Sequence, residues 1–316
     1  MRHFTSVNDV KDIHQLIRSA RSFKSGGLKT AKPGTGKVLG LIFMNPSLRT
    51  RLSTQKAGIN LGMEVMVMNF SGDGWALETR SGVIMDGNKA EHIIEASAVL
   101  GEYCDIIGIR SFPGLIDKDL DYREEILNSL IKYSGVPVIS LESATRHPLQ
   151  SLADMITIEE FKDVEKPRVV ITWAPHPRAL PQSVPNSFVE WAIAMDYDLV
   201  VTHPRGYELS GSFMKNVTIE HDQDKALEGA DFVYVKNWSS YYDYGKVLSV
   251  DPNWMINLEK LKNTRNARVM HCLPVRRNVV IADDVLDSDR SIVIEEAANR
   301  VFAAQAVIHD ILNSFG

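Results

Sequence analysis

The stretch VLGLIFMNPSLRTRLSTQKAGINLG, residues 38–62, contains one complete strand–turn–helix unit. Its first six residues are apolar, which is typical of a strand buried on both faces of a parallel sheet. Asn45 and Pro46 then turn the chain, and Ser47 is a favourable N-cap for a helix beginning at Leu48. The stretch therefore predicts an α/β fold assembled from strand–crossover–strand units.

The same alternation continues to the end of the chain. In the first half, buried parallel strands are predicted at 38–44, 64–69, 105–110 and 136–142. Helices alternate with them at 48–62, 91–103 and 122–134. After a predicted helix at 147–161 the pattern restarts, with strands at 168–174, 196–204, 230–238 and 267–274. Residues 295–315 have the apolar spacing of one long amphipathic helix.

A chain of 316 residues is longer than a single core usually supports, so two domains are expected. The predicted fold is α/β, with two doubly wound parallel-sheet domains and a C-terminal helix that returns to the first. The boundaries are placed at 1–145 together with the helix 296–316, and at 146–295.

Composition narrows the class of protein. A net charge of −5 without a basic block argues against nucleic acid or an anionic membrane as the main partner. No apolar run approaches the roughly 18 residues of a membrane span, and residues 1–10 lack the layout of a signal peptide. A cytoplasmic location is expected. Cys104 and Cys272 are far apart and belong to no CxxC pair, so neither a disulfide framework nor a zinc site is predicted.

The turn after the first strand is suited to bind an anion. Free backbone N–H groups at the predicted helix start, the hydroxyls of Ser47 and Thr50 and the guanidinium of Arg49 together make a phosphate cradle. A capped helix with solvated arginines is the alternative. Neither a P-loop nor a GxGxxG turn is present, which favours a small phosphorylated molecule over a nucleotide.

Other unusual residues also follow predicted strands, where ligands collect in open α/β sheets. Arg110 ends one strand. His147 precedes a proline at the start of a helix, and Gln150 lies in its first turn. The loops 71–91 and 174–187 are long enough to suggest function or disorder.

Two further candidates come from the second half. Cys272 follows a strand among cations, where its pKa would be lowered if it were reactive, although an isolated cysteine is more often inert packing. Arg300 is placed at the start of the final helix, from which it would reach the same crevice. Pairing with Glu296 on the same helix is the alternative.

Three ordered motifs, SLRTR (47–51), HPLQ (147–150) and HCLP (271–274), resemble the signatures of the carbamoyltransferase family. The resemblance extends over essentially the whole chain. It is strongest to the acetylornithine and succinylornithine carbamoyltransferases, through the segments 72–87, 144–154, 172–188, 235–238 and 271–278.

The resemblance implies a first domain that binds carbamoyl phosphate and a second that binds an acylated amino acid, without a metal or cofactor. It implies homotrimers with shared sites, in which Trp75 comes from the neighbouring subunit. The implied carbamoyl-phosphate ligands are Ser47, Leu48, Arg49, Thr50, Trp75, Arg110, His147, Gln150, Arg300 and the carbonyls of Cys272 and Leu273. The implied acylornithine ligands are Glu142, His176, Lys236, Arg276 and Ala90.

The chemistry of such a reaction fits these residue types. Attack of an amine on the carbamoyl carbon places negative charge on its oxygen, and donors from Thr50, Arg110 and His147 would stabilise that charge, one donor contributing ~3 kcal/mol. These three and Cys272 are the predicted catalytic residues. The proton acceptor is left open between the phosphate and Cys272.

The acyl group is predicted from one position. Ornithine enzymes have an aspartate and a Ser-Met-Gly loop where this chain has VKNWSSYYDYG (235–245), so free ornithine is disfavoured. Acetylornithine enzymes carry glutamate at the position of Ala90, and succinylornithine enzymes carry proline. Alanine at this position removes the negative charge that would repel the second carboxylate of a succinyl group. Arg178 or Arg276 would bind that carboxylate. N-succinylornithine is therefore the predicted substrate, with N-acetylornithine and a non-catalytic phosphate-ligand binder as alternatives.

Overall fold

The structure is a computed structural model, and it describes residues 1–26, 32–70 and 74–315. The chain forms two compact units. Unit 1 comprises Met1–Leu152 and Arg300–Gly316, and unit 2 comprises Ala153–Asn299. The chain passes between them within two helices, α7 (Pro148–Phe161) and α11 (Val293–Leu312). The predicted boundaries at 145/146 and 295/296 are seven and four residues earlier, close to where those helices begin.

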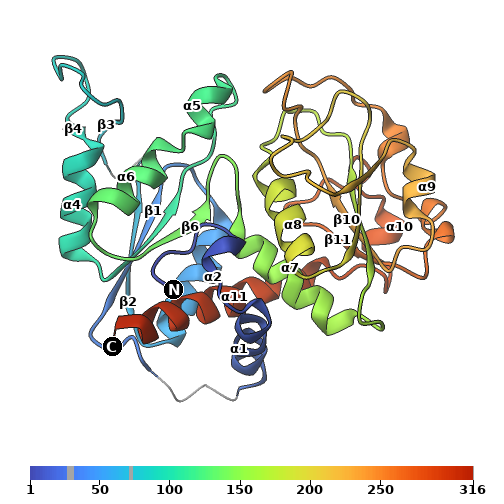
Figure 1. Cartoon of the computed structure of the whole chain (residues 1–316), viewed down its shortest axis with the longest axis horizontal. Helices are drawn as coiled ribbons and strands as arrows, with labels where there is room; N and C mark the ends of the chain where they lie inside the picture. The colour runs from blue at the N-terminus through green and yellow to red at the C-terminus, as the bar shows by residue number, and fades with distance from the viewer. Residues whose placement is uncertain (27–31, 71–73, 316) are drawn as a thin grey trace. The chain divides into compact units, whose positions relative to one another are not determined.

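Unit 1 is built on a parallel four-stranded sheet in the order β2-β1-β5-β6. Its strands are β1 (Val38–Phe43), β2 (Glu64–Asn69), β5 (Ile106–Arg110) and β6 (Val138–Glu142). Figure 1 shows α4 (Ile93–Tyr103) and α6 (Glu125–Tyr133) on one side of this sheet. α1 (Ile13–Ser25), α2 (Leu48–Asn60) and α11 lie on the other side. Helices on both faces make the unit doubly wound, as predicted.

Two elements of unit 1 differ from those predicted from the sequence. Strand β2 was predicted to be buried, but its residues alternate between exposed and half-buried because it forms the edge of the sheet. The single helix predicted at 122–134 is divided into α5 (Lys118–Tyr122) and α6. Glu124 separates them with a φ of 48°.

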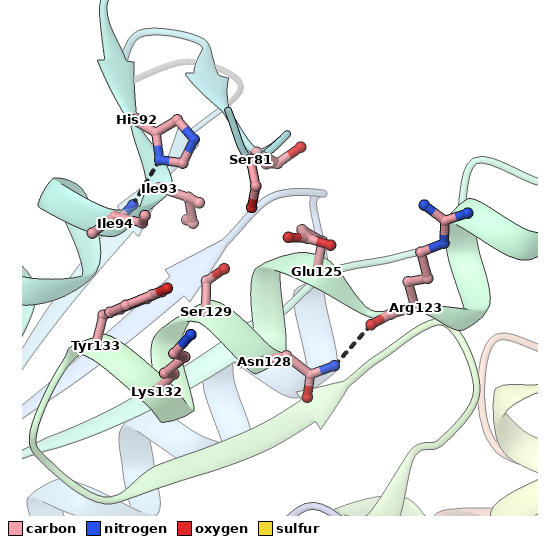
Figure 2. Close-up of a pocket in the computed structure, with 11 residues that line it drawn as sticks. Ser81, His92, Ile93, Ile94, Arg123, Glu125, Asn128, Ser129, Lys132 and Tyr133 are labelled. Atoms are coloured by element: carbon pink, nitrogen blue, oxygen red, sulfur yellow. Dashed lines mark hydrogen bonds between the residues drawn. The ribbon is translucent and has the colours of Figure 1, made fainter. Parts of the chain in front are cut away.

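The segment before α4 forms a small two-stranded element, β3 (Leu77–Glu78) and β4 (Glu91–His92). The buried carboxylate of Glu78 accepts hydrogen bonds from the side chains of Arg80 and Lys89, and the bond from Arg80 is the largest cause of its lowered pKa. His92 accepts a hydrogen bond from the backbone N–H of Ile94 and so caps α4 (Figure 2). These contacts order most of the loop predicted at 71–91, of which residues 71–73 lie outside the described part.

Unit 2 contains a parallel five-stranded sheet in the order β11-β10-β7-β8-β9. Its strands are β7 (Arg168–Trp173), β8 (Asp198–Thr202), β9 (Thr218–Glu220), β10 (Phe232–Lys236) and β11 (Arg268–Met270). Its helices are α8 (Ser183–Ala194), α9 (Gln223–Leu227) and α10 (Asp283–Leu286). Four of the strands were predicted, with ends that were too long, and the short edge strand β9 was not. α8 also begins inside the loop predicted at 174–187.

Short 3-10 helices complete the chain, at Val7–Asp9, Pro252–Trp254, Lys260–Asn263 and Asn313–Phe315. Among the described residues, no helix combines the length and apolarity that crossing a membrane requires.

Candidate active site

The start of α2 provides the N–H donors that the sequence predicted. Ser47 is the N-cap residue, with an extended φ of −153°, but its hydroxyl makes no capping hydrogen bond to the helix. The predicted position of the cap is therefore correct, and the predicted binding of phosphate by its hydroxyl stays a prediction. Arg49 is half-buried and Thr50 is buried, whereas the side chain of Leu48 is exposed. A helix start of this kind carries a partial positive charge that favours anions.

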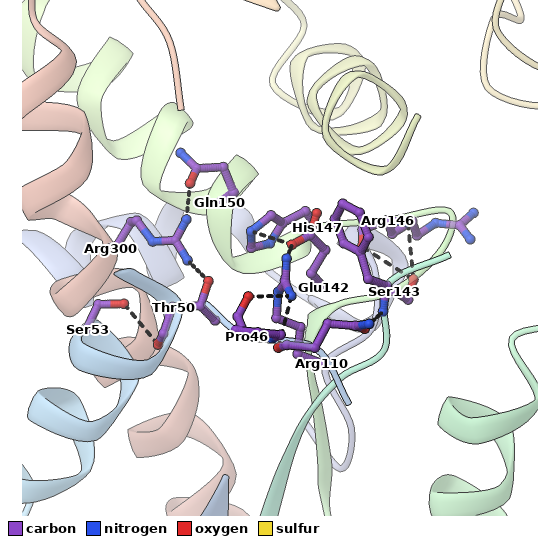
Figure 3. A network of polar contacts seen from close by, with 12 residues as sticks. Pro46, Thr50, Ser53, Arg110, Glu142, Ser143, Arg146, His147, Gln150 and Arg300 are labelled. Carbon is purple, nitrogen blue, oxygen red and sulfur yellow. Dashed lines mark hydrogen bonds and ion pairs between the residues drawn. The ribbon is translucent and has the colours of Figure 1, made fainter. Parts of the chain in front are cut away.

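Arg300 joins this helix start to the HPLQ turn. Its Nη2 donates to the Thr50 hydroxyl at 2.7 Å, and its Nη1 donates to the side-chain carbonyl of Gln150. Figure 3 shows the guanidinium between these two residues. Arg300 is not at the start of the last helix, as the sequence predicts, because α11 begins at Val293 and Arg300 lies in its third turn. It approaches Thr50 from the middle of a helix.

Arg110 lies at the end of β5 and makes a second set of polar contacts (Figure 3). Its Nη1 donates to the carbonyls of Asn45 and Pro46 at 3.1 and 3.2 Å. Its Nη2 lies 2.9 Å from Oε2 of Glu142, and the Nε2 atom of His147 lies 3.8 Å from the same oxygen. Arg110, Glu142 and His147 are all buried. A buried cation, its partner carboxylate and an imidazole therefore share one site in unit 1.

Trp75 and Ala90 do not belong to these contacts. The indole N–H of Trp75 donates to the Glu91 carboxylate at 2.9 Å, and 58% of Trp75 is exposed. Ala90 is exposed next to β4. Both residues lie on the surface of unit 1, near the β3–β4 element.

Unit 2 brings a separate set of predicted residues together. Arg276 donates from Nε to Nε2 of His176 at 2.9 Å. Burial lowers the pKa of His176, and the nearby charges of Arg276, Lys236 and Arg178 lower it further. His176 follows β7, Lys236 ends β10 and Arg276 follows β11. Three adjacent strands thus bring the cations Lys236 and Arg276 together with a neutral imidazole, and the two cations are suited to bind carboxylates.

The loops beneath this cluster are fixed by hydrogen bonds to the backbone. Asn237 donates to the carbonyl of Ala174 at 2.6 Å, and Gln182 donates to the carbonyl of Ser239 at 2.7 Å. A small hollow is lined by His176, Arg178, Ala179, Tyr207, Asn237, Trp238, Ser239, Lys246 and Val247. Asn237 and Gln182 are not among the predicted site residues, because a buried amide that binds backbone has no distinctive pattern.

Cys272 corrects the expectation of a lowered pKa. Burial of its thiol raises the pKa to about 11, and the Coulombic effect of Lys236 opposes this only in part. The carboxylates of Glu296 and Asp154 add to the increase. Cys272 as a whole residue is half-buried, whereas the neighbouring His271 is buried, and burial lowers the pKa of its imidazole to about 3. Both side chains are therefore neutral near pH 7, which argues against Cys272 as a general base.

In the described part of the chain, no group of three or more His, Cys, Asp or Glu side chains is arranged to hold a metal ion.

Two contacts of Arg110 were not predicted from the sequence. They are its pairing with Glu142, and its hydrogen bonds to the carbonyls of Asn45 and Pro46. The first had a visible signal, since both residues end adjacent predicted strands. The second had none, since any residue supplies a carbonyl.

Family models identify the class of protein to which this chain belongs. The family model for the carbamoyl-phosphate-binding domain of aspartate/ornithine carbamoyltransferases matches residues 2–160, and the model for the Asp/Orn-binding domain matches residues 181–311. The chain belongs to the aspartate/ornithine carbamoyltransferase family.

Relatives within the family are similar over their full lengths. An N-succinylornithine carbamoyltransferase of Bacteroides thetaiotaomicron is 55% identical over 99% of both chains. An N-acetylornithine carbamoyltransferase of Xanthomonas axonopodis pv. citri is 34% identical over 100% of this chain and 98% of its own. A crystal structure of an N-acetyl-L-ornithine transcarbamylase mutant, with one glutamate replaced by alanine, is complexed with carbamyl phosphate and N-succinyl-L-norvaline. It matches with a TM-score of 0.91 and 34% identity over 98% of this chain and 100% of its own.

Proposed function

We propose that this protein transfers the carbamoyl group of carbamoyl phosphate to the δ-amine of N-succinyl-L-ornithine. The products are N-succinyl-L-citrulline and phosphate, in arginine biosynthesis. The observation that carries this proposal is the convergence of Thr50, Arg110, His147 and Arg300 within unit 1. The 55% identity to a full-length N-succinylornithine carbamoyltransferase supports the same substrate.

Carbamoyl phosphate binds to unit 1 in this proposal. The N–H groups and side chains of Ser47, Leu48, Arg49 and Thr50 hold its phosphate, and Arg300 adds charge from α11. Arg110, His147 and Thr50 donate to the carbamoyl oxygen, and the Gln150 side chain and the carbonyls of Cys272 and Leu273 orient the amide. Trp75 of a neighbouring subunit completes the site.

The reaction is a substitution at the carbamoyl carbon. The neutral δ-amine attacks, the C–N bond forms, and the bond from carbon to the phosphate oxygen breaks. Negative charge that develops on the carbamoyl oxygen is stabilised by the preorganised donors, each contributing ~3 kcal/mol. Phosphate leaves with the bond electrons, and we assign the amine proton to it because Cys272 is a poor base at pH 7.

The acylated amino acid binds to the cationic cluster of unit 2. Lys236 suits its α-carboxylate, Arg178 and Arg276 suit the second carboxylate of the succinyl group, and His176 holds Arg276 through its Nε2. Glu142 is assigned to the amide nitrogen, although its carboxylate also pairs with Arg110. Ala90 stands where acetylornithine enzymes carry glutamate. A mutant of such an enzyme with alanine for a glutamate is complexed with N-succinyl-L-norvaline, which supports the succinyl assignment.

We also propose a homotrimer with shared active sites. Exposed apolar side chains on α2 and on the edge strand β2 support a contact between subunits. They are Leu48, Leu52, Ile59, Met66 and Met68. Light scattering tests this assembly, and a monomer would contradict it. A cytoplasmic location stays a prediction, which cell fractionation tests.

Mass spectrometry of a reaction with carbamoyl phosphate and N-succinyl-L-ornithine tests the proposed function. We expect N-succinyl-L-citrulline and phosphate in equal amounts. Binding of carbamoyl phosphate without turnover of any amine would instead indicate a non-catalytic binder.

A further inference from the structure

Glu124 lies outside the polar contacts around Arg110 but holds the turn that leads to His147. Its Oε1 accepts hydrogen bonds from the Ser143 hydroxyl at 2.5 Å, the Thr145 N–H at 2.9 Å and the Thr145 hydroxyl at 2.7 Å. Ser143 and Thr145 are buried, with exposed fractions of 1% and 4%. Donors this deeply buried need an acceptor inside the protein, and one carboxylate oxygen serves all three.

The backbone of Glu124 indicates that its side chain is needed at this position. Its φ of 48° and ψ of 43° place it in the left-handed region, between α5 and α6. Side chains with a Cβ are strained there, and glycine or asparagine adopts this conformation more readily. Strain of this kind persists only where the surrounding structure enforces it. The three hydrogen bonds to the turn supply that enforcement.

The turn of residues 143–146 connects the two residues that flank the proposed carbamoyl site. Ser143 donates from its N–H to the Arg146 carbonyl at 2.8 Å, and its hydroxyl accepts from the Arg146 N–H at 3.1 Å. Figure 3 shows this turn between Glu142 and His147. The carbonyl of His147 then accepts from the N–H groups of Gln150 and Ser151, which start α7. A shift of the turn would therefore move the imidazole of His147 relative to Glu142.

We propose that Glu124 is a positioning residue for carbamoyl transfer. Its carboxylate fixes the 143–146 turn and, through it, the direction in which His147 donates. Glu124 itself touches no substrate. The inference rests on the proposed function, because it assigns His147 to the carbamoyl oxygen. Displacing such a donor lowers the rate of the chemical step more than the binding of the substrate.

The decisive variant is Glu124→Gly. Glycine removes the carboxylate, so the turn loses its acceptor, and it also relieves the backbone strain, which offsets part of the stability lost with the three hydrogen bonds. We expect kcat to fall by roughly 10- to 100-fold. The KM for carbamoyl phosphate should stay within about twofold, because the phosphate contacts at α2 do not involve the turn.

Two further variants distinguish a positioning role of Glu124 from a general loss of structure. Glu124→Gln keeps an oxygen acceptor at the same place and should recover kcat to within about threefold of wild type. Glu125→Gln changes the adjacent, exposed glutamate and should have no effect. If the glycine variant does not fold, Thr145→Val, which removes one of the three donors at nearly constant volume, should lower kcat several-fold.

The outcomes distinguish this inference from the proposed function. An inactive wild-type enzyme would overturn both together. An active wild type with an unchanged kcat in Glu124→Gly, or in Thr145→Val if that variant is the one that folds, would overturn the inference alone. A glutamine variant as slow as the glycine variant would also overturn it, since the hydrogen-bond acceptor would then not be what positions the turn.

Discussion

Arg300 donates to the hydroxyl of Thr50 over 2.7 Å, although the two residues lie 250 positions apart in the chain. The same guanidinium donates to the Gln150 side chain. One residue of the last helix therefore joins the start of α2 to the HPLQ turn. The planar guanidinium of arginine has several N–H groups and can donate to both acceptors, whereas the single ammonium group of lysine cannot hold both in this geometry.

The first prediction follows from that geometry. Arg300→Lys keeps the charge but loses the fork, so one of its two acceptors loses its partner. Charged hydrogen bonds of this kind contribute about 2 kcal/mol, and kcat/KM for carbamoyl phosphate should fall roughly 30-fold in steady-state assays. Arg18→Lys, at an exposed arginine of α1, is the matched control. A value within twofold of wild type for Arg300→Lys would contradict the role of the fork.

The second prediction concerns the buried ion pair. Glu142→Ala would leave the Arg110 guanidinium buried without its partner carboxylate. Breaking a buried pair from one side costs about 3 kcal/mol, so the free energy of unfolding in urea should fall by that amount. Glu64→Ala, at an exposed glutamate of β2, should change it by less than about 0.5 kcal/mol. An equal effect of the two variants would show that the pair does not stabilise the fold.

The third prediction concerns the protonation of Cys272. Its pKa of about 11 in the folded protein lies above the ordinary value of about 9.0. The stability that the neutral thiol contributes is therefore fully present below pH 9 and is lost as the pH rises toward 11.

The rate of alkylation by iodoacetamide measures this pKa, in a Cys104→Ala background that leaves Cys272 as the only thiol. In folded protein the rate should rise steeply only above pH 10. In protein unfolded by urea, the rate of alkylation should already rise near pH 9. A folded-state midpoint below pH 8 would restore Cys272 as a candidate base.

The fourth prediction concerns the acyl group. Ala90→Glu introduces a carboxylate that would repel the second carboxylate of a succinyl substrate. The ratio of kcat/KM for N-acetylornithine to that for N-succinylornithine should rise at least tenfold. Gln15→Glu adds the same charge on α1 and should leave the ratio unchanged. An unchanged ratio in Ala90→Glu would refute the charge argument.

Patterns within one element were predictable from the sequence. The run at 38–43 has the composition of a buried strand, and the turn after it predicted the helix that begins at Leu48, because both features are local. Arg110 was predicted for the same reason, as a cation directly after an apolar strand. His147 and its proline marked a helix start, and α7 begins at Pro148.

Features that depend on neighbours were not predictable in the same way. Strand β2 has the apolar composition of a buried strand but forms an edge, because strand order is a property of the whole sheet. The pKa of Cys272 depends on burial and on Asp154, Glu296 and Lys236, which are distant in sequence. The break at Glu124 is enforced by Ser143 and Thr145 rather than by its own neighbours.

The most direct test of the central claim is a steady-state comparison of three amines with carbamoyl phosphate: ornithine, N-acetylornithine and N-succinylornithine. The account predicts that kcat/KM for N-succinylornithine exceeds the other two values by at least tenfold. A higher value for N-acetylornithine or for ornithine would contradict the substrate assignment, and no turnover of any of the three would contradict carbamoyl transfer itself.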